Sequence, residues 1–181
     1  PNVQITPFRE GVKPHNADDF LHGVELVVDV VDLFAMNDKL TLNAKAREKK
    51  IPVLSCAMLG FAGCMVAFDA ETPSFAELTG MSANADSKDN MDKFFRFICP
   101  AIPDYMLEQT VKSFDGSTYI PFVVPGGEIA AALGATEAMK TILGKGNRIR
   151  APKGVFMDPY RMEVKIFDAS SKARRIPSHF I

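Results

Sequence analysis

The segment from residue 24 to residue 59 constrains the fold of this chain more than any other part. It opens with the apolar run "VELVVDVVDLFAMND", whose Val and Leu residues are typical of a strand covered on both faces. The amphipathic stretch "NDKLTLNAKAREKKI" follows, with basic residues at its end, and predicts a helix. The next run, "IPVLSCAML", indicates a second strand. A strand, a helix and a strand of these lengths predict a parallel pair with a right-handed crossover.

The flanking segments continue this pattern. Residues 2–8 alternate between apolar and polar side chains in the manner of a strand. Residues 16–23 predict a short helix, with Asn16 as its cap and Gly23 at its end. Residues 63–69 predict a strand after a glycine turn. We therefore expect an α/β fold with a mostly parallel sheet flanked by helices.

The second half of the chain is expected to complete the same domain. Residues 71–119 lose the strand pattern and contain two helical segments, so we interpret them as a helical insertion or lid. The stretch 125–146 predicts a long helix that starts after Pro125 and Gly126 and is capped by Gly144, with one face of small residues that permits close packing. Residues 154–168 predict a C-terminal β-hairpin. The length of 181 residues fits a single domain over residues 1–181.

Composition excludes several classes of protein. The formal net charge is -1, which provides no electrostatic footprint for nucleic acid or an anionic membrane surface. No apolar run is long enough for a transmembrane helix, and the N-terminus does not resemble a signal peptide. The chain begins at Pro1 without Met, as expected after processing or cleavage or in a fragment.

The 3 cysteines are an odd number and form no CxxC pair, so neither a disulfide framework nor a structural zinc site is expected. A reducing, cytoplasmic setting is the default expectation. Cys99 has apolar neighbours, which raise the pKa of a thiol, so a buried structural role is favoured over a nucleophile. Cys56 and Cys64 are interpreted as core residues.

Asp29 and Asp32 stand in the apolar run, where an unpaired buried carboxylate would be costly or would lose its charge. One interpretation places Asp29 at a strand edge and makes Asp32 the N-cap of the next turn, because Asp is a preferred cap. The other relies on the rule that ligands of open α/β sheets bind beyond the carboxyl ends of strands. Asp32 follows the predicted strand, so its carboxylate could hold Mg²⁺ against a nucleotide phosphate. The residues alone leave both interpretations open.

Four segments, taken in order, resemble the ubiquitin-activating-enzyme-like family of ThiF, MoeB and HesA. The start "PNVQITPF" is similar to the family's Asn-Pro-x-Val-x-Ile strand. The segment "VELVVDVVDLFAMNDKLTLN" resembles its Asp-x-Val-x-Asp-x-x-Asp-Asn motif and following helix. The segment "IPVLSCAMLGFAGCMVAFD" resembles its Pro-leucine strand, Gly-x-x-Gly turn and hairpin. The helix "GGEIAAALGATEAMKTILG" is similar to the late helix ending in Ala-x-Glu-Ala-x-Lys-x-x-x-Gly.

This resemblance implies the C-terminal part of a Rossmann-like domain that adenylates a carboxylate with ATP and Mg²⁺. The acceptor would usually be the C-terminal glycine of a ubiquitin-like or sulfur-carrier protein, and a homodimer is expected. By position, Asp32 matches the aspartate that positions magnesium and the phosphates, so Asp32 is the predicted catalytic, cofactor-binding and metal residue. Asp29 matches a preceding acid that we interpret as structural. The zinc-binding CxxC pairs of many members do not occur, so zinc is not expected.

The sequence also departs from the family pattern. Leu33 stands where Asn usually follows the key aspartate, and Asn37 stands where an arginine is expected. The glycine-rich loop, the ribose-binding acid and the cations that grip ATP would lie upstream of Pro1. We therefore expect this chain to be inactive alone, and a non-catalytic relative or dimer partner is the alternative. A nicotinamide- or flavin-binding oxidoreductase is a third hypothesis, but it would require a dinucleotide fingerprint that this sequence does not contain.

Overall fold

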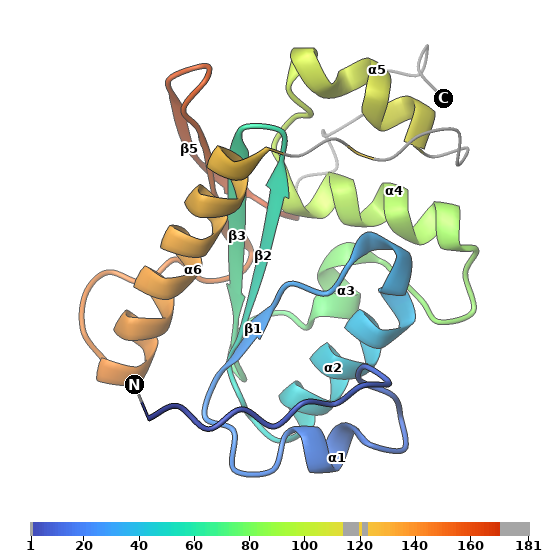
Figure 1. Ribbon diagram of the computed structural model, residues 1–181, viewed down its shortest axis with the longest axis vertical. Helices are drawn as coiled ribbons and strands as arrows, with labels where there is room; N and C mark the ends of the chain where they lie inside the picture. The colour runs from blue at the N-terminus through green and yellow to red at the C-terminus, as the bar shows by residue number, and fades with distance from the viewer. Residues whose placement is uncertain (1, 114–119, 121–122, 171–181) are drawn as a thin grey trace.

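The computed structural model describes residues 2–113, 120 and 123–170. In these residues the strands are β1 (Val27–Asp29), β2 (Val53–Leu59), β3 (Ala62–Phe68), β4 (Lys153–Asp158) and β5 (Glu163–Asp168). The helices are α1 (Ala17–Phe20), η1 (Leu33–Ala35, a 3-10 turn), α2 (Met36–Glu48), α3 (Phe75–Thr79), α4 (Ser87–Ile98), α5 (Asp104–Ser113) and α6 (Val124–Leu143). Figure 1 shows α6 on one side of the sheet and α2, α3 and α4 on the other. The predicted α/β, Rossmann-like class with flanking helices is confirmed.

The sheet is mixed, so the prediction that most of its strands would pair in parallel is wrong. The strand order is β1-β2-β3-β4-β5, and only β1 and β2 pair in parallel. The pairs β2–β3, β3–β4 and β4–β5 are antiparallel. A parallel pair requires a long crossover, which α2 provides between β1 and β2. Only Gly60 and Phe61 separate β2 from β3, and so short a connection can join only antiparallel strands.

The predicted strand over residues 2–8 does not form. These residues have no regular secondary structure, and the side chains of Val3 and Ile5 are 78% and 81% exposed. Alternation of apolar and polar residues stabilises a strand only where a neighbouring strand and a core surface receive it. The described part of the chain provides neither for this segment.

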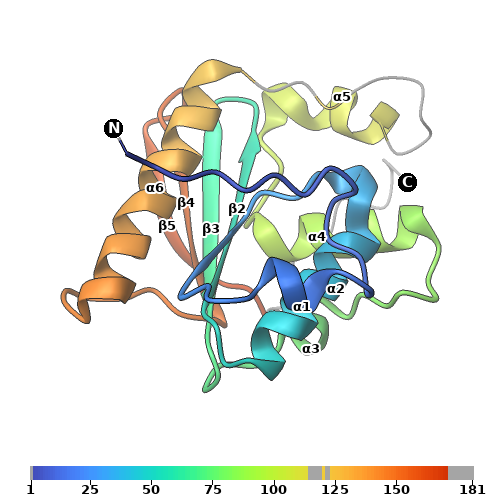
Figure 2. The same ribbon diagram turned by 60° about the horizontal axis from the view of Figure 1, so that its bottom comes forward.

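The two faces of the sheet bury different clusters of side chains. On one face, residues of α2, α3 and α4 pack against β2 and β3 and form the larger cluster, which includes Leu42, Phe75, Phe94 and Phe97. The other face is covered by α6 (Figure 2). The smaller cluster on this face includes Leu54 and Met65. Neighbouring residues of β2 and β3 therefore point into opposite layers, as the twofold period of a strand requires.

Helix α6 lies unusually close to the sheet because it has glycines at its contacts. A side chain at Gly126 would overlap the carbonyl oxygen of Gly60 in the β2–β3 turn. A Cβ on Gly63 of β3 would lie 2.5 Å from the backbone nitrogen of Ala130. The helix ends at Gly144, which has a left-handed φ of 61°. The predicted close approach and C-terminal cap of this helix are confirmed, although it begins at Val124, before the expected start after Gly126.

The segment 71–119 is helical as predicted in its described residues, which end at 113. Besides the two expected helices it contains α3, whose N-terminus is a capping box between Ser74 and Glu77. Helix α4 contributes Phe94 and Phe97 to the main core, so it forms part of the layer that covers the sheet. Whether this segment also acts as a lid stays a prediction. Among the described residues, no helix combines the length and apolarity needed to cross a membrane.

Candidate functional site

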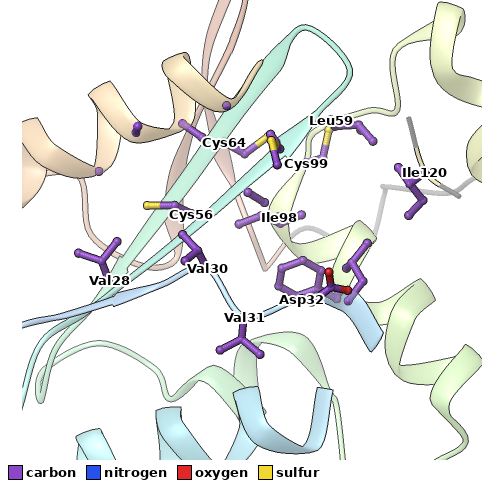
Figure 3. A pocket seen from close by; sticks show the side chains of 18 of the residues that line it. Val28, Val30, Val31, Asp32, Cys56, Leu59, Cys64, Ile98, Cys99 and Ile120 are labelled. Carbon is purple, nitrogen blue, oxygen red and sulfur yellow. The ribbon is translucent and has the colours of Figure 1, made fainter. Parts of the chain in front are cut away.

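A cavity of about 730 Å³ lies beyond the carboxyl end of β1. Its walls come from β1 and the loop after it, from β2, and from helices α4 and α6 (Figure 3). The cavity exists because β1 is short: it pairs with Val53, Leu54 and Ser55 only. The rest of β2, from Cys56 to Leu59, lacks a strand partner on this side in the described chain. This is the place where open α/β sheets bind ligands.

The lining of the cavity is almost entirely apolar. Val28 and Val30 from the β1 side, Phe94 and Ile98 from α4, and small residues of α6 form most of it. Among the lining residues that the structure describes, Asp32 is the only carboxylate, and there is no Lys, Arg or His. The cavity volume suits a ligand of the size of a nucleotide. Its walls, however, offer no positive charge to a polyphosphate.

Asp29, the first of the two acids in the apolar run, is fully buried and fully compensated. Its carboxylate accepts a hydrogen bond from Lys39 Nζ at 2.7 Å, and Lys39 is itself only 1% exposed. Asn43 Nδ2 donates to it at 3.1 Å, and the backbone N–H of Val31 donates at 3.1 Å. The hydroxyl of Ser55 donates at 3.4 Å. These contacts agree with a structural role, because they leave no part of this carboxylate for a ligand.

Lys39 and Asn43 are the residues that sequence reasoning missed. They lie on α2 one helical turn apart, so both face the sheet and reach the same carboxylate. The Lys39 ammonium also lies over the ring of Phe94, 4.9 Å from its centroid. The available signal was the four-residue spacing of the two polar residues on a predicted helix. That spacing alone does not predict which carboxylate Lys39 and Asn43 contact.

Asp32, the second acid, lies outside the core at the start of η1. Its backbone is extended, and Oδ1 accepts a hydrogen bond from the backbone N–H of Phe34 at 2.9 Å. The predicted capping role is therefore observed. The side chain is exposed and also lines the cavity, so the same carboxylate faces the site in which a ligand would lie (Figure 3). Its roles in catalysis and in binding cofactor and metal stay predictions.

The residues around Asp32 fit a magnesium ion only if the ligand supplies most of the coordination. No group of three or more His, Cys, Asp or Glu side chains in the described residues could hold a metal ion. Magnesium is often bound through one or two carboxylates, with water and phosphate oxygens completing its octahedron. Asp32 could serve as that single carboxylate, with a bound nucleotide supplying phosphate oxygens.

The three cysteines are buried, as predicted, and all three line the cavity. Cys64 and Cys99 come from β3 and the end of α4, and their side chains meet (Figure 3). The hydrogen bond between these two thiols, together with burial, raises the pKa of Cys64. Burial raises the pKa of the Cys56 thiol to about 12. Raised values disfavour the thiolate, so neither Cys56 nor Cys64 is suited to nucleophilic catalysis.

Comparison with known proteins agrees with this architecture. The model of the ThiF family matches residues 1–177. The crystal structure of selenomethionine PaaA is similar in fold, with a TM-score of 0.55 and 10% sequence identity. That match covers 87% of this chain but only 39% of PaaA, so the chain spans about two fifths of that protein. No curated protein matches. The fold and the cavity at the end of β1 define a Rossmann-like α/β domain, and the family match shows that the chain belongs to the ThiF family.

Proposed function

We propose that this chain forms part of an ATP-dependent adenylyltransferase that activates a carboxylate with ATP and Mg²⁺. The acceptor of the proposed reaction is the C-terminal carboxylate of a ubiquitin-like or sulfur-carrier protein. Family membership over residues 1–177 supports the reaction class. The observation that carries the proposal is the position of Asp32, an exposed carboxylate at the carboxyl end of β1 and at the cavity.

In the proposed site, Asp32 holds the magnesium side of the nucleotide. The Phe34 N–H occupies one lone pair of Oδ1 and fixes the orientation of the carboxylate. A magnesium ion held between Asp32 and the phosphates would neutralise phosphate charge in a reaction in which the acceptor's C-terminal carboxylate attacks the α-phosphate and pyrophosphate leaves. The contribution of this chain is to position that one exposed carboxylate beside an apolar cavity.

The proposed reaction also needs positive charge that this cavity does not contain. Transfer of a nucleotidyl group depends on cations that grip the phosphates, and the described lining residues include none. We therefore expect the cationic groups to come from polypeptide outside this chain. The outer edge of β1 has no strand partner in the described residues, and Val28 and Val30 beside it are 49% and 70% exposed. A strand added there would complete both the sheet and the site.

The test is ATP–pyrophosphate exchange by the longest natural polypeptide that contains this chain, compared with the chain alone. We expect exchange from the longer protein and none from the isolated chain. Asp32→Asn is the decisive variant, because Asn caps a helix as well as Asp does but has no charge. It should reduce exchange by about 100-fold or more. Asp19→Asn, an exposed acid on α1, is the matched control and should have no effect.

Unchanged exchange in Asp32→Asn would refute the magnesium role of Asp32. Robust exchange by the isolated chain would refute the need for outside cations. Loss of exchange in Asp32→Ala alone, with Asp32→Asn active, would assign Asp32 to capping only.

The alternative function is a non-catalytic ThiF-type subunit, and the almost entirely apolar lining of the cavity, with no cation among its described residues, favours it. Leu33, which also lines the cavity, stands where Asn usually follows the key aspartate in the family. Calorimetric titration of the longest natural polypeptide with Mg·ATP discriminates the two functions. A non-catalytic subunit should show no magnesium-dependent ATP binding, whereas an adenylyltransferase should bind ATP only with the metal present.

A further inference from the structure

The lining of the cavity divides into a buried floor and an exposed rim. Leu59, Cys64 and Ile98 belong to the floor, and these side chains are at most 3% exposed. Val30 and Phe34 belong to the rim, where they are 70% and 63% exposed. An apolar floor below an apolar rim gains free energy when an apolar molecule displaces water from it. The shape and lining of the cavity therefore favour an apolar occupant.

The thiols on the floor add no charge to it. Burial raises the pKa of the Cys56 thiol to about 12, and the hydrogen bond with Cys99, together with burial, raises the pKa of Cys64. Both thiols are therefore uncharged at neutral pH, and an uncharged thiol behaves as a small apolar group. An anionic group placed on this floor would lose its hydration without gaining a cation.

The charge in the lining lies on the rim. Asp32 is the only charged residue among the described lining residues, and its side chain is exposed. The backbone N–H of Phe34 donates to Oδ1, and no described cation pairs with this carboxylate. Figure 3 shows the Asp32 carboxylate apart from Cys64 and Cys99. The complementary ligand is therefore apolar over most of its length and positively charged at one end.

We propose that the cavity binds a small apolar molecule that ends in an amine, with its apolar body on the floor and its ammonium group at Asp32. The volume of about 730 Å³ lies within the range of sites for small molecules, about 300 to 1,000 Å³. Burial of the apolar body supplies most of the affinity, because an exposed ion pair contributes little. The inference goes beyond the proposed function and does not depend on it, since neither ATP nor magnesium takes part.

Isothermal titration calorimetry without ATP or Mg²⁺ tests the proposal on the longest natural polypeptide that contains this chain. The probes are octylamine, octan-1-ol and octanoate, which share a chain length and differ in charge. Octylamine should bind with a dissociation constant of about 10 to 100 μM. Octan-1-ol should bind about two- to fivefold more weakly, which is the contribution of an exposed ion pair. Octanoate should bind most weakly, because Asp32 repels it.

Asp32→Asn should remove this order without removing binding, because Asn keeps the cap but has no charge. The dissociation constants of octylamine and octan-1-ol should then agree within about twofold. Asp19→Asn on α1 is the control and should leave the preference for the amine unchanged. These variants separate the inference from the proposed function. If Asp32→Asn loses ATP–pyrophosphate exchange but the parent protein shows no preference for the amine, only the inference fails.

Two further measurements test the apolar part of the proposed site. Octylamine should bind at least about tenfold more tightly than butylamine, because each buried methylene adds affinity, whereas a rim carboxylate alone would bind both equally. Ala131→Trp, an exposed position of α6 that lines the cavity, should weaken octylamine binding at least about threefold by occupying part of the space. Ala132→Trp, next to it and also exposed but outside the lining, is the matched control.

Far-ultraviolet circular dichroism checks that these variants fold. Absence of octylamine binding would overturn the proposal, and so would octanoate binding as tight as that of octylamine. Equal affinity for butylamine and octylamine would reduce the site to an ion pair at Asp32 and would also overturn it. Equal effects of Ala131→Trp and Ala132→Trp would place the ligand outside the cavity, which is the remaining result against it.

Discussion

Substitution of Lys39 by Met should destabilise the fold strongly, because it leaves the buried charge of Asp29 without its cation. The two side chains are 1% and 0% exposed, and Nζ lies 2.7 Å from Oδ1. Breaking a buried ion pair from one side typically costs about 3 to 5 kcal/mol. Asp29 keeps its hydrogen bonds from Val31, Asn43 and Ser55, so we expect the lower end, about 3 kcal/mol. That is a large fraction of the stability of a typical domain, about 5 to 15 kcal/mol.

The control is a pair of equal length at the surface. Lys93 Nζ also lies 2.7 Å from a carboxylate oxygen, that of Asp89, but the side chains are 31% and 50% exposed. Lys93→Met should therefore cost no more than about 0.5 kcal/mol. Equilibrium unfolding in urea, followed by circular dichroism at neutral pH, measures both variants against the parent chain.

The double variant Asp29→Asn with Lys39→Met completes the cycle. The double variant should have a free energy of unfolding at least about 1 kcal/mol higher than that of Lys39→Met alone, because no uncompensated charge remains buried. The reasoning fails if Lys39→Met costs as little as Lys93→Met. It also fails if the two single substitutions add independently, since a coupled pair cannot behave that way.

Three further outcomes can be measured on the same chain. Gly126→Ala should lower the free energy of unfolding in urea by at least about 2 kcal/mol, because the added Cβ overlaps the β2–β3 turn. Gly127→Ala, whose added Cβ has its nearest contact at 3.4 Å, should leave this free energy unchanged or raise it. Hydrogen bonds from Ser74 hold the pKa of Glu77 below its ordinary 4.5, so this group contributes stability above that pH that is lost as the pH falls through the lowered folded value. Ser74→Ala removes the hydroxyl donor but keeps the backbone N–H, so it should reduce that part of the acid sensitivity, and parallel unfolding at about pH 6 and pH 3 would show it. Because burial raises the pKa of Cys56 to about 12, Ellman's reagent at about pH 8 should modify this thiol only as the chain unfolds, and prompt reaction of the native protein would contradict this.

Hydrophobic periodicity predicted the elements that are long and locally consistent. Helix α2, helix α6 and the strands β2 and β3 were expected close to their observed bounds. The local sequence also has end signals for these elements, such as Gly144 after α6. The segment 2–8 also has a repeat, but its strand does not form because pairing is a tertiary property. The same reason explains why we expected more parallel pairs than the sheet contains. Whether two strands are parallel depends on which strands become neighbours in the folded protein.

At the candidate site, the order of residues along the chain predicted the position of Asp32, but it did not predict the surroundings of this side chain. The sequence placed Asp32 at the end of a strand, and the structure has it there as the cap of η1. Sequence reasoning could not predict the cavity beside it, since its walls come from residues as far apart as Val28 and Ala135. Nor could it predict that the walls lack cations. Both properties depend on which distant side chains meet.

The amino-acid sequence by itself therefore determined the local elements, the short β2–β3 turn, the small-residue contact of α6 and the two candidate acids. Periodicity, capping residues and glycines act over a few positions, so they can be read directly from the chain. Only the tertiary structure decided the different roles of Asp29 and Asp32. Asp29 lies in the core with Lys39 and Asn43 from α2, while Asp32, three residues later, faces a cavity. The physical reason is that the chain turns outward between them, and a charge is tolerated in the core only with the partners that folding brings to it.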